Sequence, residues 1–186
     1  MRFPLVLTTS LAEYIIKNKL AGRKQFPLVL MLEPLHRCNL SCAGCGRIRE
    51  YHASLDQILT PEQCLAAVAE CGAPVVSICG GEPLIYSQIG ILCEQILAQG
   101  KFIYLCTNGT LLAQKLGDFH PHSHFFINVQ LDGMEETHDH CAGRTGVFQA
   151  ALQGIQAAKA AGFMVCTNTT VYRETDMKEV EDLLAL

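Results

Sequence analysis

Several features of membrane-spanning, secreted and nucleic-acid-binding proteins are missing from the sequence. No uninterrupted apolar run reaches the roughly 18 residues that a membrane-spanning helix needs, so we expect no transmembrane segment. Residues 1–22 contain charged side chains and no small-residue cleavage pattern, so we expect a cytoplasmic protein rather than a secreted one. Acidic residues outnumber basic ones, and the formal net charge of −4 gives general nucleic-acid binding no electrostatic support.

Low-complexity tracts, Gly/Ser-rich linkers and internal repeats are also missing, which favours one continuous domain. We expect residues 1–25 to form an N-terminal helical extension and residues 26–186 to form the core domain. Within the extension, four apolar side chains fall near one helical face beside four basic ones, namely Leu11, Ile15, Ile16 and Leu20 beside Lys17, Lys19, Arg23 and Lys24. This pattern favours a helix that packs on the floor of a barrel, and an anchor on a membrane surface is the alternative.

Apolar runs alternate with helix-like segments along the rest of the chain. Strands are expected in 26–33, 73–81, 101–109, 125–133 and 163–171, followed by helices in 59–72, 87–100, 111–117, 146–162 and 176–186. Thr60 and Gly72 have the residue types of a helix N-cap and a helix C-terminus. The alternation predicts an α/β fold with parallel strands, in which ligands bind where the strands end.

Three of the ten cysteines are clustered: Cys38, Cys42 and Cys45 form a C-x3-C-x2-C motif directly after the first expected strand. Without an export signal, this motif favours metal or redox chemistry over a disulfide framework. A structural zinc ion usually takes four protein ligands, and no second C-x2-C pair follows, so three thiols favour an iron–sulfur cluster with one open corner. The isolated Cys64, Cys71 and Cys93 fall in or at the end of helices and are expected to behave as small apolar residues.

Polar and glycine-rich stretches follow the later strands. The two glycines of "CGGEP" would let the backbone approach a ligand, although this stretch alone is typical of an ordinary turn. The alternation of "FFINVQLDG" predicts that Asn128, Gln130 and Asp132 share one face of a strand, inside a barrel or in a hydrogen-bonded barrel end. No further ligand pattern accompanies "HDH", so residues 138–140 are interpreted as polar groups of a loop.

The cysteine motif after the first strand, together with "GGEP" after the second, resembles the radical S-adenosylmethionine (SAM) enzymes. The resemblance implies a partial (βα)-barrel, in which Cys38, Cys42 and Cys45 hold a [4Fe-4S] cluster whose fourth iron binds SAM. One electron from the cluster would then release a 5′-deoxyadenosyl radical. The resemblance also implies that the backbone from Gly80 to Pro83 receives the methionine amino group, with Glu82 ordering the loop. Further cofactor contacts are expected from Asn108, Asn128, Gln130, Asp132 and Arg144, the last of which is otherwise only an exposed arginine.

Longer stretches resemble the hopanoid-biosynthesis radical SAM proteins, the adenosylhopane synthases: "GRKQFPLVLMLEPLHRCNLSCAGCG", "ECGAPVVSICGGEPLI", "FIYLCTNGTLL" and "VQLDGMEETHD". This resemblance implies a transferase that adds the radical to the terminal alkene of a C30 hopene such as diploptene, giving adenosylhopane. The tertiary carbon radical left by the addition must receive a hydrogen atom, and Cys106 is the expected donor, a structural buried thiol being the alternative. The implied partners are a hopene, a flavodoxin or ferredoxin electron donor, and the inner face of the membrane.

The family's partial barrel has six strand–helix units, whereas this sequence stops within the fifth expected helix. We therefore expect a barrel truncated after about five units. Three alternatives stay open: a radical SAM enzyme acting on a peptide or another small molecule, an inactive fragment of such an enzyme, and a non-enzymatic iron–sulfur carrier or zinc-stabilised module. A carrier would normally use a fourth cysteine and needs no "GGEP".

Overall fold

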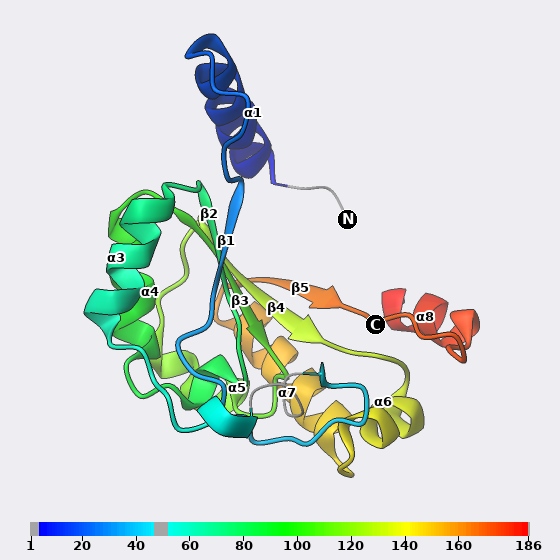
Figure 1. Ribbon diagram of the computed structural model, residues 1–186. Helices are drawn as coiled ribbons and strands as arrows, with labels where there is room; N and C mark the ends of the chain where they lie inside the picture. The colour runs from blue at the N-terminus through cyan, green and yellow to red at the C-terminus, as the bar shows by residue number, and fades with distance from the viewer. Residues whose placement is uncertain (1–3, 47–51, 186) are drawn as a thin grey trace.

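A computed structural model describes residues 4–46 and 52–185. In these residues one sheet contains five parallel strands in chain order: β1 (Val29–Leu32), β2 (Val75–Ile78), β3 (Phe102–Thr107), β4 (Phe125–Gln130) and β5 (Met164–Asn168). The helices are α1 (Leu5–Leu20), α3 (Pro61–Cys71), α4 (Ile89–Ala98), α5 (Leu112–Lys115), α6 (Glu135–Ala142), α7 (Val147–Ala160) and α8 (Met177–Leu184) (Figure 1). The α/β architecture and the parallel pairing predicted from the sequence are confirmed, and the strands form part of a barrel.

The helix caps show how local sequence sets the element bounds. The Thr60 hydroxyl accepts a hydrogen bond from the Gln63 N–H at 3.3 Å, and the Gln63 side-chain oxygen accepts one from the Thr60 N–H at 2.8 Å. This reciprocal pair satisfies backbone donors that the first turn of α3 leaves free. Gly72 ends the helix with a φ of 66°, a left-handed conformation that glycine adopts without steric cost.

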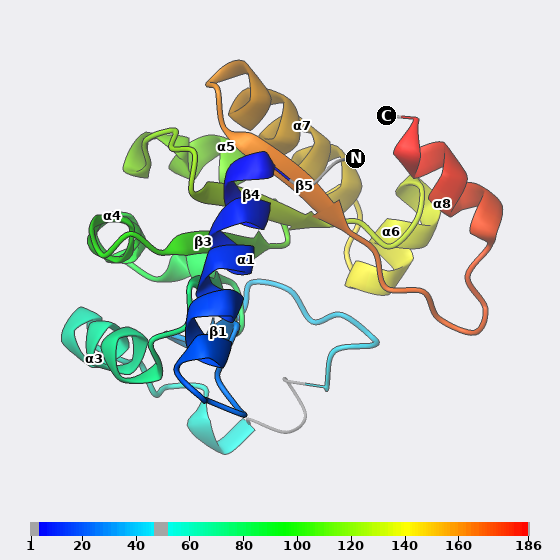
Figure 2. The same cartoon turned by 90° about the horizontal axis from the view of Figure 1, so that it is seen from above.

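The two faces of the sheet differ in burial. Ile78, Leu105 and Ile127 are in register on adjacent strands, and all three are fully buried in the main hydrophobic core beneath α3, α4 and α7. Figure 2 shows these helices around the outside of the sheet. The opposite face, called here the inner face, carries the alternate residues of each strand, which are less buried. Cys64 and Cys93 lie within the core, as predicted for small apolar residues.

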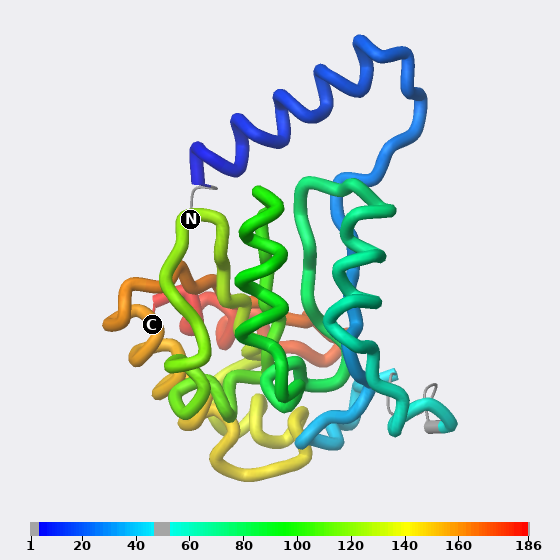
Figure 3. Tube along the Cα trace, turned by 90° about the vertical axis from the view of Figure 1, so that its left-hand side faces the viewer, coloured from blue at the N-terminus to red at the C-terminus, as the bar shows by residue number. Residues whose placement is uncertain are grey.

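Helix α1 lies across the end of the sheet at which the strands begin (Figure 3). Leu7 is only 3% exposed and packs with Val75, Phe102 and Phe126, which stand at or near the starts of three strands. This contact agrees with the predicted packing on the barrel floor. None of the helices in the described residues has the length and apolar character required to cross a bilayer.

The interpretation of residues 138–140 as part of a loop is wrong, because these residues lie in helix α6. The segment has no apolar stripe that would predict a helix, and it is stabilised from outside. Glu179 of α8 accepts hydrogen bonds from the Met134 N–H at 2.8 Å and from the Thr137 hydroxyl at 2.9 Å, so a distant carboxylate caps the first turn. The Asp139 carboxylate in turn accepts hydrogen bonds from the Gly146 and Phe148 N–H groups at the start of α7.

Candidate functional site

The cysteine loop, residues 38–45, follows β1 and is held by several other elements. The Cys38 sulfur accepts a hydrogen bond from the Leu40 N–H at 3.4 Å, and the Ala43 N–H donates to the Cys141 carbonyl of α6 at 3.0 Å. Cys38 and Cys42 pack against a small apolar cluster formed by Leu40, Ala142 and Val147. The loop is therefore anchored to the junction between α6 and α7.

The three clustered thiols lie within electrostatic range of one another. Burial raises the pKa of the Cys38 thiol, and burial together with the neighbouring Cys38 and Cys45 raises the pKa of Cys42 to about 11. Three thiolates this close together require a compensating positive charge, which a metal group supplies. Across residues 4–46 and 52–185, no three His, Cys, Asp or Glu side chains converge tightly enough for a single metal ion. Three cysteine thiolates are a donor set that iron–sulfur clusters use, with one thiolate at each of several metal corners.

The loop after β3 contacts the cysteine loop through side-chain amides. The Asn108 amide donates to the Asn39 side-chain oxygen at 2.8 Å and lies 3.9 Å from the Cys38 sulfur. The Asn39 amide donates to the Thr110 hydroxyl at 2.9 Å, and that hydroxyl donates to the Asn108 side-chain oxygen at 2.6 Å. Asn108, expected to contact a cofactor, thus also fixes the cysteine loop.

The structure gives a different reason for the two glycines of the "GGEP" loop from the one that the sequence suggested. A Cβ atom on Gly80 would lie 2.3 Å from the Leu35 carbonyl oxygen, and one on Gly81 would lie 2.0 Å from the Arg37 carbonyl oxygen. The space that a side chain would need is filled by the chain's own backbone and not left for a ligand. The N–H groups of Gly81 and Glu82 donate to the Leu35 and Arg37 carbonyls at 3.1 and 3.0 Å. These bonds join the "GGEP" loop directly to the segment that leads into Cys38.

Glu82 is 1% exposed, and its carboxylate connects two loops. One oxygen accepts hydrogen bonds from the Leu84 N–H at 3.0 Å and from the Thr107 hydroxyl at 2.8 Å, and the other accepts from the Asn108 N–H at 2.8 Å. Burial raises the pKa of this carboxyl group, and the three hydrogen bonds oppose that rise. Glu82 therefore orders the ends of β2 and β3, and Pro83, buried beside it, starts the short 3-10 helix Pro83–Ile85.

Replacing Glu82 with glutamine is expected to destabilise the apoprotein by about 1–3 kcal/mol, because the new amide group opposes one of these donors. The raised pKa of Glu82 in the folded state also determines how its contribution to stability depends on pH. The folded state holds the Glu82 proton more tightly than the unfolded state, so this contribution to stability is complete below the ordinary value of 4.5 and is lost as the pH rises through the folded pKa. The stability difference between wild type and Glu82→Gln should therefore shrink from pH 4.5 towards neutrality. Urea unfolding of both proteins at several pH values checks this, and a difference that grows with pH would contradict it.

The predicted shared face of β4 is confirmed for Asn128 and Gln130, which are half-buried and alternate with the buried Ile127 and Val129, whereas Asp132 lies beyond the end of the strand at Gln130. At the end of the strand, the Gln130 amide donates to the Asp132 carboxylate and to the Thr170 hydroxyl. The Asp132 carboxylate also accepts the Thr170 N–H at 2.8 Å. These bonds tie the ends of β4 and β5 together at the mouth of the barrel.

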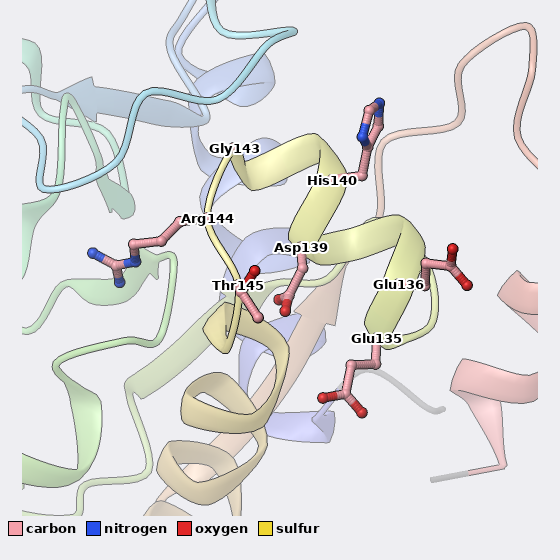
Figure 4. A pocket seen from close by; sticks show the side chains of 7 residues that line it. All are labelled: Glu135, Glu136, Asp139, His140, Gly143, Arg144 and Thr145. Carbon is pink, nitrogen blue, oxygen red and sulfur yellow. The ribbon is translucent and has the colours of Figure 1, made fainter.

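Arg144 follows α6 and borders a cavity of about 730 Å³ that is otherwise lined by Glu135, Glu136, Asp139, His140, Gly143 and Thr145. Figure 4 shows the Arg144 side chain pointing away from the acidic side chains of this cavity. Its guanidinium group donates to the Asn39 carbonyl of the cysteine loop at 3.4 Å. The arginine is therefore directed towards the cysteine loop, where a guanidinium group could also receive a carboxylate.

Sequence reasoning missed the side chains that border the cysteine loop on its other side. A cavity of about 410 Å³ is lined by Ala43, Gly44, Asp132, Thr137, His140, Cys141, Tyr172, Glu174 and Thr175. The Tyr172 hydroxyl lies 2.5 Å from the position that a Cβ atom on Gly44 would take. A glycine between two clustered cysteines was the one sequence signal that another side chain packs there.

Cys106 lies on the inner face, half-buried, at the register position of Asn128. Its sulfur lies 3.4 Å from the Ser77 hydroxyl and 3.6 Å from the Asn128 amide nitrogen. The expected site residues thus gather from the ends of the strands, with Cys106, Asn128 and Gln130 on the inner face and the cysteine and "GGEP" loops above them.

Comparisons with known proteins agree on one family. The family model described as the radical SAM superfamily matches residues 32–186. The Fe-coproporphyrin III synthase of Methanosarcina barkeri is 30% identical over 165 residues, which cover 84% of this chain and 40% of that protein. The GTP 3′,8-cyclase of Pseudomonas savastanoi pv. phaseolicola is 30% identical over 182 residues, which cover 94% of this chain and 54% of the relative. The chain spans about half the length of these curated relatives.

Solved structures show the same fold. Streptococcus suis SuiB bound to S-adenosylmethionine matches all of this chain and 42% of its own, with a TM-score of 0.64 and 19% identity. Native anSMEcpe with bound AdoMet and the Kp18Cys peptide matches 86% of this chain and 48% of its own, with a TM-score of 0.61 and 21% identity.

Proposed function

The chain belongs to the radical SAM superfamily of enzymes, which use a [4Fe-4S] cluster and S-adenosylmethionine, and from this premise we propose that it serves adenosylhopane formation. The proposed reaction cleaves SAM reductively and adds the 5′-deoxyadenosyl radical to the terminal alkene of a hopene such as diploptene. The proposal that this site cleaves SAM rests on one observation, the direct backbone hydrogen bonding of the "GGEP" loop to the segment before Cys38. The proposal that the substrate is a hopene is supported by the four sequence stretches that resemble the adenosylhopane synthases and by the thiol of Cys106 on the inner face.

Each residue of the site has a proposed role. Cys38, Cys42 and Cys45 provide the three thiolates for the cluster, which when bound supplies the electron that cleaves SAM. In this proposal the backbone from Gly80 to Pro83 receives the methionine amino group. In this proposal, polar contacts to the cofactor come from the mouth of the barrel and from the segment that follows the end of α6, namely from Asn108, Asn128, Gln130, Asp132 and Arg144.

The test of this function is anaerobic reconstitution with iron and sulfide, reduction, and incubation with SAM and diploptene. Formation of a carbon-linked adenosyl adduct by mass spectrometry is the expected result. Formation of 5′-deoxyadenosine without adduct would reject the hopene substrate and favour a peptide or another small molecule, and the absence of both would reject catalysis by these residues alone. A ferredoxin or flavodoxin is the proposed electron donor, and chemical reduction by dithionite in a parallel reaction separates a failed donor from a failed enzyme.

Cys106→Ala is expected to leave total SAM cleavage, measured as released methionine, within about twofold of wild type. The adduct yield should fall at least about tenfold, because a positioned proton donor typically contributes about 10²–10⁴-fold and the carbon radical needs its hydrogen donor in the same way. Cys106→Ser is the matched variant, because it keeps the hydrogen-bonding positions but replaces the weak S–H bond with a strong O–H bond. Both variants should lose adduct. An unchanged yield in either would remove Cys106 as the hydrogen donor.

A membrane contact is proposed for the outer face of α1, because the substrate is a lipid. Leu5, Ile16 and Leu20 are 76%, 57% and 84% exposed there, beside the exposed Lys17 and Lys19. Ile16→Glu with Leu20→Glu should reduce co-sedimentation with anionic vesicles several-fold while leaving the buried Leu7 contact intact. Equal sedimentation of wild type and variant would count against the contact.

A further inference from the structure

Asn128 stands between two thiols on the inner face of the sheet. The register places it directly between Cys106 on β3 and Cys166 on β5. The Asn128 amide nitrogen donates to the Cys106 sulfur at 3.6 Å, and the Cys166 thiol donates to the Asn128 side-chain oxygen at 3.4 Å. One amide therefore bridges both thiols, with its donor towards Cys106 and its acceptor towards Cys166.

The orientation of that amide follows from the state of Cys166. Burial raises the pKa of Cys166 to about 11, and the neighbouring Cys106 adds to the rise, so near neutral pH Cys166 carries a proton that it can donate. Its single S–H hydrogen has two acceptors within reach, the Asn128 side-chain oxygen at 3.4 Å and the Ile127 carbonyl oxygen at 3.6 Å, and the contact with Asn128 is the shorter one. A thiol that donates to the Asn128 oxygen holds that oxygen on the β5 side and leaves the NH₂ group facing β3.

The direction of the NH₂ group determines whether Cys106 donates its S–H hydrogen to Asn128. A sulfur atom that accepts an N–H does not give its own hydrogen to that neighbour, so Asn128 leaves the Cys106 S–H hydrogen uncommitted. The remaining contacts of the sulfur are the Ser77 hydroxyl at 3.4 Å and the Tyr104 carbonyl at the long distance of 3.9 Å. An aspartate at position 128 would do the opposite, because its oxygen would accept the S–H.

We propose that Asn128 is a positioning residue that holds the Cys106 thiol ready to donate a hydrogen atom, with Cys166 fixing the direction of the amide. This inference rests on the proposed function and replaces a direct cofactor contact as the main role of Asn128. In the step it serves, the Cys106 S–H bond breaks and a C–H bond forms at the tertiary carbon radical, leaving a thiyl radical on Cys106. One electron from a ferredoxin-class or flavodoxin-class donor and one proton from solvent restore the thiol.

The contact can be tested in the apoprotein, without cofactor or substrate, by the alkylation rate of each thiol with iodoacetamide. Cleavage after Lys101 and Lys115 gives peptide 102–115, in which Cys106 is the sole cysteine, and cleavage after Lys159 and Arg173 gives peptide 160–173, in which Cys166 is the sole cysteine. Mass spectrometry of the two peptides therefore follows each thiol separately. The reactive form is the thiolate, so the rate reports on the groups around the sulfur.

Asn128→Asp should slow alkylation of Cys106 about tenfold, because a carboxylate replaces an N–H donor beside the thiolate. Cys166→Ala should slow it by a smaller factor, because the released amide can turn its oxygen towards Cys106. The matched control is Asn168→Asp, which adds the same charge on β5 at a residue that donates to Gln130 rather than to a thiol, and it should change the rate less than twofold. Equal effects of Asn128→Asp and Asn168→Asp would overturn the contact.

The second readout separates the positioning role from cofactor binding. In the reconstituted enzyme, Asn128→Leu should lower the adduct yield about tenfold more than it lowers total SAM cleavage, which is measured as released methionine, because the hydrogen donor is then misplaced. Weaker SAM binding, with both products falling together, would assign Asn128 to the cofactor and overturn the proposal. If wild type makes no adduct, the proposed substrate fails, and the alkylation rates alone then support or overturn the placement of Cys106 by Asn128.

Discussion

Replacing Cys38, Cys42 or Cys45 with alanine is expected to abolish the formation of 5′-deoxyadenosine from SAM. Each thiol is the proposed ligand of a different metal corner, and no other described cysteine is anchored in the same loop. Loss of a residue that merely supports a metal ligand lowers affinity or activity about 10–100-fold, so loss of a ligand itself should exceed a hundredfold. Iron content, the visible absorption of the reconstituted cluster, and chromatography of the SAM products measure the effect.

Cys71→Ala is the matched control for these three variants. Cys71 closes α3 on the outside of the sheet, has an intermediate exposure like the clustered cysteines, and has no proposed role in the site. This variant should retain wild-type iron content and 5′-deoxyadenosine formation. A single clustered-cysteine variant that retained both would show that the ligand set is wrong.

Gly81→Ala is expected to be the most disruptive change outside the cysteines. The new Cβ atom would lie 2.0 Å from the Arg37 carbonyl oxygen, and a backbone atom cannot rotate aside as a side chain can. The "GGEP" loop would have to separate from the segment before Cys38, with loss of the hydrogen bond from the Glu82 N–H to the Arg37 carbonyl. We expect a loss of about 3–4 kcal/mol in the free energy of unfolding, at the upper end of single substitutions, together with failure to assemble the cluster.

The same substitution at Gly117 provides the control. No heavy atom lies within 4 Å of a Cβ atom at that position, and Gly117 is not among the glycines with a positive φ. Gly117→Ala should therefore change the free energy of unfolding by less than about 0.5 kcal/mol. Urea unfolding of the two apoproteins, followed by circular dichroism, compares them directly, and similar midpoints would show that the close approach at Gly81 is not essential.

Much of the fold was predictable because its signals are local. Apolar runs marked the five strands, and residues such as Thr60 and Gly72 marked helix ends. Helix α6 escaped prediction because its cap comes from Glu179, which lies 45 residues beyond Met134, and no local pattern reveals such a contact. The interpretation of residues 138–140 as a loop was wrong for this reason.

The site was predictable in its residue types but less so in its contacts. The alternation along β4 correctly put Asn128 and Gln130 on one face. It could not show that Asn128 is level with Cys106 and Cys166, because that depends on the register of three strands. Likewise, the glycines at 80 and 81 indicated a close approach, but the sequence alone could not show that the approaching atoms are the carbonyl oxygens of Leu35 and Arg37.

The strand order has a consequence for how the molecule assembles. Each strand pairs with the one made just before it, so the sheet can grow by successive short-range additions as the chain leaves the ribosome. The cysteine loop behaves differently, since its anchors at Asn108, Thr110 and Arg144 lie 69, 71 and 105 residues downstream of Asn39. The segment that is synthesised first among the site residues therefore acquires its fixed shape only after β3 and α6 exist. If cluster assembly requires this fixed shape, we expect the metal to be loaded only after β3 and α6 have folded.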